Sequence, residues 1–344
     1  MTIRINEERI HSIIAQVKPK TVLFNAPGGL IKQTRELMEK IEKNYGIRCI
    51  FSGDTCYGIC DYTESDARNL GADAVIHVGH SATIDSIGNY IFFVEAYDDV
   101  RFDDVIDKAA QTLHSYKKVG LATYSQHLHM IAEAKQRLEN FGFDVFVGGG
   151  NNLLQTGQVF GCDFSTIFNL KDVVDTFLFL GQSEFHAVGI AIATGKPTYM
   201  LDPYFNEIVD MEKQARERIK KAILAVYRAA DASSFGVITG LKEGQLMRKR
   251  SEWITKKLEM LGKKVFKLAM REITPERLAP YRDIEAFIQT ACPRISIDGY
   301  NFDRPILSIP QSDALVRLLE GRDVGDFLVR PKWIELTVGL IKRS

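Results

Sequence analysis

Short apolar runs that predict buried strands alternate along the chain with longer segments whose apolar residues recur at helical spacing. The first such run, Thr21–Asn25, is followed by a turn-forming segment at 27–29. A helix is predicted next, ending at Gly46 before a second strand over 48–52. This alternation is typical of α/β proteins with mostly parallel sheets. The inward stripe of the helix comprises Leu30, Leu37, Met38, Ile41 and Tyr45.

The same alternation recurs twice more. A short helix over 63–70 and strands over 74–78 and 90–94 complete the first unit. The second unit has a helix over 128–141, and its inward residues include Leu138 and Phe141. Its strands are predicted over 118–124, 144–147, 175–180 and 197–201. A long charged helix over 210–230 leads to the third unit, with a helix over 246–261 and strands over 234–239, 264–268, 284–289 and 306–309.

Three such units in 344 residues predict three similar small domains, because one hydrophobic core rarely organises a chain of this length. Each domain is expected to be a mostly parallel sheet flanked by helices, and the repetition predicts an internal triplication. The predicted domains are residues 1–105, 106–209 and 210–344, with the third beginning at the bridging helix.

Composition narrows the classes of function. Hydrophobic residues make up 45% of the chain and charged residues 26%, which is ordinary for a globular protein. The net charge is zero, so bulk electrostatics do not support a nucleic-acid partner. The N-terminal segment is charged throughout, and no apolar run approaches the roughly 20 residues of a membrane helix. We therefore expect a cytoplasmic protein with no membrane partner.

The chain has five cysteines, an odd and small number that argues against a disulfide framework. Cys60 and Cys162 each follow the second strand of their unit, and Cys292 follows the third strand of its own. The carboxyl ends of parallel strands lie on the ligand-binding edge of a sheet. We therefore expect these three cysteines to meet at a central site between the domains.

Thiolates in such loops suit zinc or an iron-sulfur cluster. Three ligands without a fourth would leave one iron of a 4Fe-4S cluster open to substrate. Cys56 and Cys60 nearly complete a C-x-x-x-C-x-x-C signature, but Thr63 stands at the third position. The alternative for each cysteine is a small buried hydrophobic residue without chemistry.

Polar residues at strand ends are candidates for the same pocket. Gln158, Gln182, His186 and Asp298 are selected for substrate or cofactor binding by their position in motifs, and His186 is the best histidine candidate. Four other residues near Cys60 and the third strand each have two possible roles. Asp54 and Asp61 orient the metal ligands or cap turns, whereas His77 and His80 are partly buried histidines with satisfied hydrogen bonds or, for His80 equally, pocket residues.

Four motifs together resemble those of a known family, the archaeal 2-(3-amino-3-carboxypropyl)histidine synthases. They are D-T-C-Y-G-I-C-D, G-Q-V-F-G-C, G-Q-S-E-F-H-A-V-G-I-A-I-A-T-G-K-P with the following L-D-P-Y, and Q-T-A-C-P-R-I-S-I-D. The resemblance spans nearly the whole chain. It implies that Cys60, Cys162 and Cys292 each come from one domain and hold a single 4Fe-4S cluster. Cys56 departs from the family pattern, which commonly has a small hydroxyl residue there, so we expect it to neighbour the cluster.

The resemblance also implies a reaction and its partners. Enzymes of this noncanonical radical S-adenosylmethionine family break the bond between sulfur and the γ-carbon of the methionine moiety. The 3-amino-3-carboxypropyl radical then adds to a histidine of translation elongation factor 2, in the first step of diphthamide biosynthesis. A transferase that acts as a homodimer and needs an electron donor is expected.

Two other functions remain open from the residues alone. A dehydratase or lyase like quinolinate synthase also combines three small α/β units with three cysteines. A binding module with a structural metal is the second alternative. Methylthioadenosine released from S-adenosylmethionine would identify the transferase, and colourless, zinc-containing protein would identify the binding module.

Overall fold

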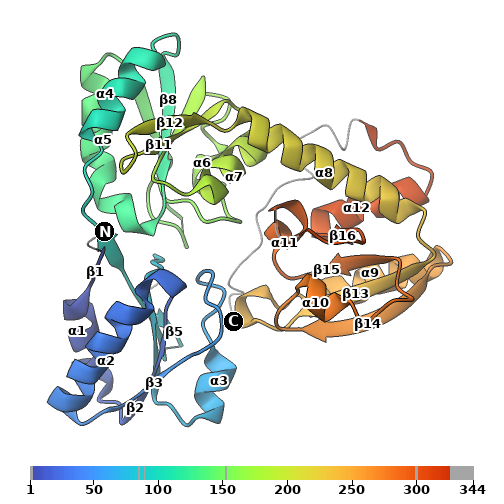
Figure 1. Cartoon of the computed structure of the whole chain (residues 1–344), viewed down its shortest axis with the longest axis horizontal. Coiled ribbons are helices and arrows are strands. Elements are labelled where there is room, and N and C mark those ends of the chain that lie inside the picture. The colour runs from blue at the N-terminus through green and yellow to red at the C-terminus, as the bar shows by residue number, and fades with distance from the viewer. Residues whose placement is uncertain (1–2, 84–85, 89, 152, 299–300, 326–344) are drawn as a thin grey trace.

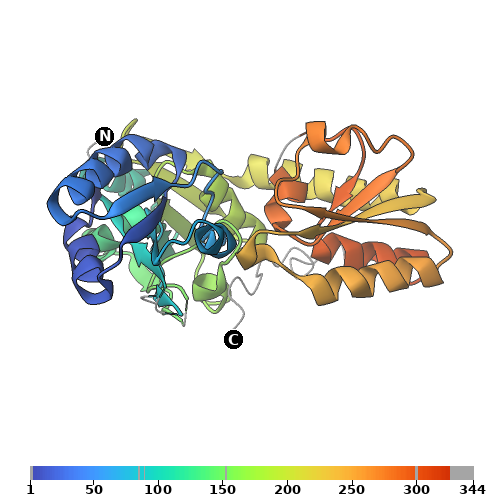
Figure 2. The same cartoon turned by 90° about the horizontal axis from the view of Figure 1, so that it is seen from below.

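The computed structural model describes residues 3–83, 86–88, 90–151, 153–298 and 301–325. Within these ranges the chain forms three mostly parallel sheets flanked by helices and one two-stranded ribbon. Each large sheet is the centre of one lobe (Figure 1). In Figure 2 the third lobe stands to the right of the other two, and the long helix α8 (Glu212–Ala230) connects it to the second.

The first lobe is built on the sheet with strand order β3-β2-β4-β6-β5. Helices α1 (Glu7–Val17) and α2 (Ile31–Tyr45) bury their apolar stripes against one face of it. The other face packs against the loop that contains Cys60 and against α3 (Glu64–Asn69). The parallel strands are β2 (Thr21–Asn25), β3 (Arg48–Phe51), β4 (Ala74–Val78) and β6 (Ile91–Val94), and β5 (Ser86–Ile87) is an antiparallel edge.

The second lobe is built on the sheet with strand order β12-β11-β10-β8-β9. Helices α4 (Asp103–Thr112) and α5 (Ile131–Asn140) cover one face, and α7 (Glu184–Thr194) covers the other. A short helix, α6 (Ser165–Phe168), follows the Cys162 loop. The strands are β8 (Lys118–Thr123), β9 (Asp144–Val147), β10 (Thr176–Leu180), β11 (Thr198–Asp202) and the antiparallel edge β12 (Glu207–Asp210).

The third lobe has four parallel strands in the order β14-β13-β15-β16. Helix α8 packs against both α7 of the second lobe and α12 of the third, so one apolar core runs through the two lobes. The elements of this lobe are β13 (Ser234–Gly240), α9 (Arg248–Met260), β14 (Lys264–Met270), α10 (Pro275–Leu278), β15 (Ala286–Gln289), α11 (Pro293–Asp298), β16 (Ile306–Leu307) and α12 (Ile309–Leu319).

The α/β class and the mostly parallel sheets predicted from the sequence are confirmed. When only the parallel strands are counted along the chain, their order in all three sheets is second, first, third, fourth. The internal triplication stays a prediction. The proposed boundary at residue 105 falls within α4. No helix in the described parts of the chain is both long and apolar enough to cross a membrane.

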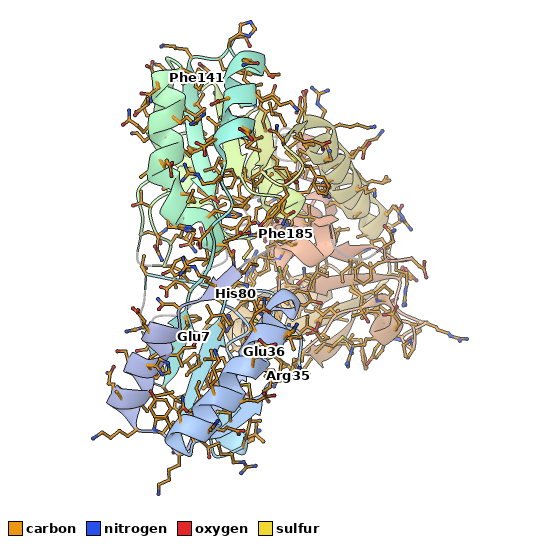
Figure 3. The ribbon with its side chains drawn as sticks, turned by 60° about the vertical axis from the view of Figure 1, so that its left-hand side comes forward. Glu7, Arg35, Glu36, His80, Phe141 and Phe185 are labelled. Atoms are coloured by element: carbon orange, nitrogen blue, oxygen red, sulfur yellow. The ribbon has the colours of Figure 1, made fainter. Side chains whose placement is uncertain are left out.

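Two details differ from the predicted pattern. The side chains of Phe141 and Tyr45 were expected to face inward, yet they are 50% and 47% exposed. A 3-10 turn occupies Ser125–Met130, so α5 starts only at Ile131 and ends before Phe141, which lies at the outer end of the second lobe (Figure 3). Tyr45 is the last residue of α2, beyond the part of the helix that covers the sheet, and its hydroxyl contacts His11 at 2.9 Å.

Candidate metal centre

The carboxylate of Asp61 fixes the loop that carries Cys60 between β3 and α3. Its Oδ2 atom accepts hydrogen bonds from the backbone N–H groups of Tyr57 at 2.8 Å and Gly58 at 3.2 Å. The side chain of Asn25, at the carboxyl end of β2, donates to the backbone carbonyl of Asp61. Asp61 therefore caps this turn, which is one of the two roles that the sequence suggested for it.

A buried cation from the third lobe neutralises Asp61. Lys242, in the loop after β13, places its ammonium nitrogen 2.6 Å from Asp61 Oδ1 and 2.8 Å from Glu272. The side chains of Lys242 and Asp61 are only 7% and 3% exposed. Burial disfavours the charged lysine, but the two carboxylates raise its pKa above the usual value. The lysine therefore stays charged and joins the third lobe to the first.

The same loop of the third lobe contacts Cys60 directly. The backbone N–H of Gly244 donates to the Cys60 carbonyl at 3.1 Å, and Gln245 Nε2 donates to Cys60 Sγ at 3.2 Å. A Cβ atom at position 244 would lie 2.5 Å from Cys60 Cα, so this close approach requires glycine. The Cys60 sulfur is thus held by a residue 185 positions away in sequence.

An arginine connects the loops of Cys162 and Cys292. Arg294 follows Cys292 by two residues, and its guanidinium donates to the backbone carbonyls of Gly161 at 2.9 Å and Phe185 at 2.6 Å. The guanidinium carbon also lies 3.7 Å from the centre of the Phe185 ring. Figure 3 shows Phe185 where the lobes meet. The loop before α11 is therefore anchored on the loop that contains Cys162.

The three predicted cysteines lie within electrostatic range of one another. Burial, followed by the charge of Asp61, raises the pKa of the Cys60 thiol, and Cys292 adds to this effect. Burial also raises the pKa of Cys162, with Cys292 and Cys60 as the next contributions. Cys60 is buried, and Cys162 and Cys292 are partly exposed. The three thiols, one from each lobe, therefore lie close enough for their charges to affect one another.

The chemistry of this site fits a metal cluster. Burial makes deprotonation of these three thiols costly unless a positive charge lies beside them. A bound iron or zinc ion supplies such a charge. The cysteines belong to three different lobes, and the described part of the chain contains no disulfide among its cysteines.

His186 lies close to this site and is uncharged. Burial, followed by the positive charge of Arg294 and by His80, lowers the pKa of His186 to about 3. Its Nδ1 atom is 2.7 Å from the hydroxyl of Ser183, and its ring stacks on Phe179 with an interplanar angle of 3°. The ring of His186 is therefore held in one orientation, and it is a neutral imidazole near Arg294.

The other three pocket candidates have different settings. Gln158 is fully buried, and its amide bonds within the chain to Ser81 at 2.9 Å and Gln155 at 2.9 Å. Gln182 is half-buried at the carboxyl end of β10, where its backbone interacts with Tyr124. Asp298 is the last residue of α11, and its side chain lies outside the described residues.

The sequence did not single out the residues of the third lobe that contact the Cys60 loop. Lys242, Gly244 and Gln245 belong to the segment L-K-E-G-Q, which comes directly after the strand β13. The signal that was overlooked is a glycine among polar residues at the carboxyl end of a parallel strand. Arg294 was visible only as part of the C-P-R motif.

Fold and site together define an α/β protein in which three lobes contribute cysteines to one site, and thiols of this kind are typical iron-sulfur ligands. The family model described as putative diphthamide synthesis protein matches residues 26–323. The chain belongs to this family.

Characterised relatives cover the chain almost completely. The 2-(3-amino-3-carboxypropyl)histidine synthase of Pyrococcus horikoshii is 31% identical over 336 residues, which are 95% of each chain. Subunit 1 of the Schizosaccharomyces pombe synthase is 30% identical and is matched over 92% of this chain and 74% of its own length. The crystal structure of Dph2 from Pyrococcus horikoshii with a 4Fe-4S cluster has a TM-score of 0.82 at 30% identity, covering 92% of this chain and 91% of that one.

Proposed function

We propose that this protein transfers a 3-amino-3-carboxypropyl group from S-adenosylmethionine to a histidine of translation elongation factor 2, the first step of diphthamide synthesis. We further propose that Cys60, Cys162 and Cys292 hold one 4Fe-4S cluster for this reaction. The observation that carries the proposal is that these three thiols come from three lobes and lie close enough for their charges to raise one another's pKa. Relatives named as synthases and a similar structure with a 4Fe-4S cluster support it.

A cluster held by the thiolates of Cys60, Cys162 and Cys292 would supply an electron to the sulfonium of S-adenosylmethionine. In the proposed reaction the bond between sulfur and the γ-carbon breaks, which gives methylthioadenosine and a 3-amino-3-carboxypropyl radical. The radical would form a carbon–carbon bond with the imidazole, and the adduct would return one electron to the oxidised cluster and release one proton to water, which restores the aromatic ring. An electron donor would be needed to reduce the cluster before the first reaction.

The surroundings of the thiols suit a cationic substrate next to thiolates. The N–H of Gln245 stabilises the Cys60 sulfur as a thiolate by donating to it. Burial keeps His186 and His80 neutral, with pKa values lowered to about 3 and about 4, so neither ring repels a sulfonium at neutral pH. Fixed dipoles beside the Cys60 sulfur, such as the amide of Gln245, can then orient the bond that breaks.

We also propose Gln158, Gln182, His186 and Asp298 as residues that bind or position S-adenosylmethionine. For Gln158 the proposed role is positioning, because its amide contacts Ser81 and Gln155. A homodimer that admits a loop of elongation factor 2 is part of the proposal. Membership of this family favours the transferase over a quinolinate synthase-like lyase or a structural-metal module.

The proposal is tested by the fate of S-adenosylmethionine. The anaerobically reconstituted, reduced protein should release methylthioadenosine, and single alanine variants of Cys60, Cys162 and Cys292 should lose both this activity and bound iron. Cys49→Ala is the matched control, because Cys49 is half-buried in β3 and should leave iron content unchanged. Full iron content after loss of Cys162, or no methylthioadenosine from the iron-loaded protein, would contradict the proposal.

A further inference from the structure

A second cluster of metal-binding side chains lies beside the cysteine site. Cys56 from the loop after β3, His77 from β4 and His80 from the following turn bring one ligand atom each within 4.8 Å of the others. The Nε2 atom of His77 is 2.9 Å from Nδ1 of His80. The sulfur of Cys56 is 3.7 Å from His77 Nε2 and 4.0 Å from His80 Nδ1. Figure 3 shows His80 at the junction of the lobes.

These distances are close to those that a tetrahedral zinc site requires. Zinc binds imidazole nitrogen at about 2.0–2.1 Å and thiolate sulfur at about 2.3 Å. In a tetrahedron the two nitrogens are then separated by roughly 3.3 Å, and each nitrogen lies roughly 3.6 Å from the sulfur. The two histidines need to separate by only a few tenths of an ångström, and the sulfur needs to approach them by a similar amount, to hold an ion between them.

The protonation states of the two histidines favour metal binding. Burial lowers the pKa of His77 well below its usual value, with His80 as a smaller contribution. Burial also lowers the pKa of His80 to about 4, against the opposing charge of Asp61. Both rings are therefore neutral at neutral pH and have a lone pair for a metal. His77 is fully buried, and its Nδ1 atom lacks a hydrogen-bond partner among the described residues.

The thiol of Cys56 completes a ligand set of one sulfur and two nitrogens. Cys56 is 5% exposed, and burial raises its pKa to about 12, followed by the negative charge of Asp61, while Lys242 opposes the shift. A bound divalent ion would replace the proton of this thiol and offset the cost of its charge. A borderline-soft ion such as zinc is favoured by this combination of ligands.

The three side chains are separate from the proposed cluster ligands. The Cys60 sulfur interacts with Gln245 and with the thiol of Cys292, whereas the Cys56 sulfur contacts the two histidines. We propose that Cys56, His77 and His80 form a second metal site, which binds a zinc-class divalent ion and leaves one coordination position open. Such an ion would tie the loop before Cys60 to the end of β4. This site goes beyond the proposed transferase function and does not depend on it.

The test uses cobalt(II) as a spectroscopic substitute for zinc in the full chain. The background variant carries Cys60→Ala, Cys162→Ala and Cys292→Ala, which removes the competing thiols. Anaerobic titration should give one bound cobalt with a thiolate-to-cobalt charge-transfer band. Adding Cys56→Ser should abolish the band and weaken binding at least about tenfold, because a protein ligand is lost. Adding Cys49→Ser to the same background is the matched control and should leave the band unchanged.

Two further measurements keep the result decisive. His80→Gln in the same background retains the thiol and should weaken cobalt binding, and circular dichroism establishes that each variant is folded. In the cluster-loaded protein with its natural cysteines, zinc per chain should fall when Cys56 is replaced by serine. Absence of the band in the background variant, or a band that survives Cys56→Ser, would overturn the proposal.

Discussion

Replacing Gly244 by alanine tests whether the third lobe positions Cys60. The added Cβ would lie 2.5 Å from Cys60 Cα, 2.7 Å from its Cβ and 2.9 Å from its carbonyl oxygen. Ordinary carbon contacts are about 3.5–4.0 Å, so the two loops must separate by roughly 1 Å. The atoms in the way are mainly backbone atoms, and they cannot move aside by rotating a side chain.

Two contributions determine how much Gly244→Ala destabilises the contact between the loops. Overpacking of this kind costs about 1–3 kcal/mol, and weakening the hydrogen bond from Gly244 to Cys60 costs about 0.5–1.5 kcal/mol. A total of about 2–4 kcal/mol lowers the population of the close arrangement roughly 30- to 1000-fold. Because Gln245 reaches the Cys60 sulfur only in this arrangement, Gly244→Ala should lose iron to a chelator much faster than the parent protein.

The assay is iron per chain after anaerobic reconstitution, followed over time in the presence of the chelator. Gly53→Ala is the control, because a Cβ atom at this position in the loop of Cys60 meets no atom within 4 Å. It should retain iron like the parent protein. If Gly244→Ala is folded and keeps its iron as long as the control, the contact between the loops does not hold Cys60 in place.

Three other predictions concern the same region. Gln245→Leu removes the N–H donor to the Cys60 sulfur. It should lower the midpoint potential of the cluster by roughly 50 mV in a redox titration. An unchanged potential would refute the role of this hydrogen bond. Lys242→Met leaves the Asp61 carboxylate buried without its cation and should destabilise the fold by about 3–5 kcal/mol in thermal unfolding, and adding Asp61→Asn should recover part of the loss. In the unfolded chain His186 takes up a proton below about pH 6.5, whereas in the folded chain it does so only near pH 3. The contribution of neutral His186 to the free energy of unfolding is therefore complete above pH 6.5 and is lost as the pH falls towards 3. Between roughly pH 6 and 4 the parent should therefore lose up to about 1.4 kcal/mol per pH unit more than His186→Gln, and parallel stability curves would contradict this.

The sequence predicted those parts of the fold that local patterns determine. Buried strands such as Thr21–Asn25 and Ala74–Val78 have the predicted bounds, because each is a short apolar run between turn residues. The ribbon of β1 (Ile3–Ile5) and β7 (Ala96–Asp98) was not predicted. Each strand has only three residues, and each pairs with a segment about ninety positions away, so neither carries a recognisable period.

The candidate site also has residues that the sequence predicted and residues that it did not. The rule that ligands gather at the carboxyl ends of parallel strands selected Cys60, Cys162 and Cys292, whose thiols interact in the structure. The roles of Lys242 and Gln245 depend on contacts with another lobe, and no local pattern encodes the partner of a side chain at such a separation.

The partners of His77 and His80 likewise could not be predicted from local sequence patterns. The sequence predicted His77 as a partly buried residue with a satisfied hydrogen bond, and for His80 it favoured this interpretation and a pocket residue equally. The two rings do bond to each other, but His77 is fully buried and both rings lie against Cys56. The two histidines are three residues apart in sequence, whereas the thiol beside them comes from a loop that only the packing of the first lobe brings near.

The central claim is the transfer of a 3-amino-3-carboxypropyl group by a site that three lobes assemble. The most direct measurement is the mass of archaeal elongation factor 2 after incubation with S-adenosylmethionine and the reduced, iron-loaded protein. We predict one added 3-amino-3-carboxypropyl group on a single histidine, and no addition with the Cys162→Ala variant. An unmodified factor, in the presence of a fully loaded cluster and a competent reductant, would contradict the account.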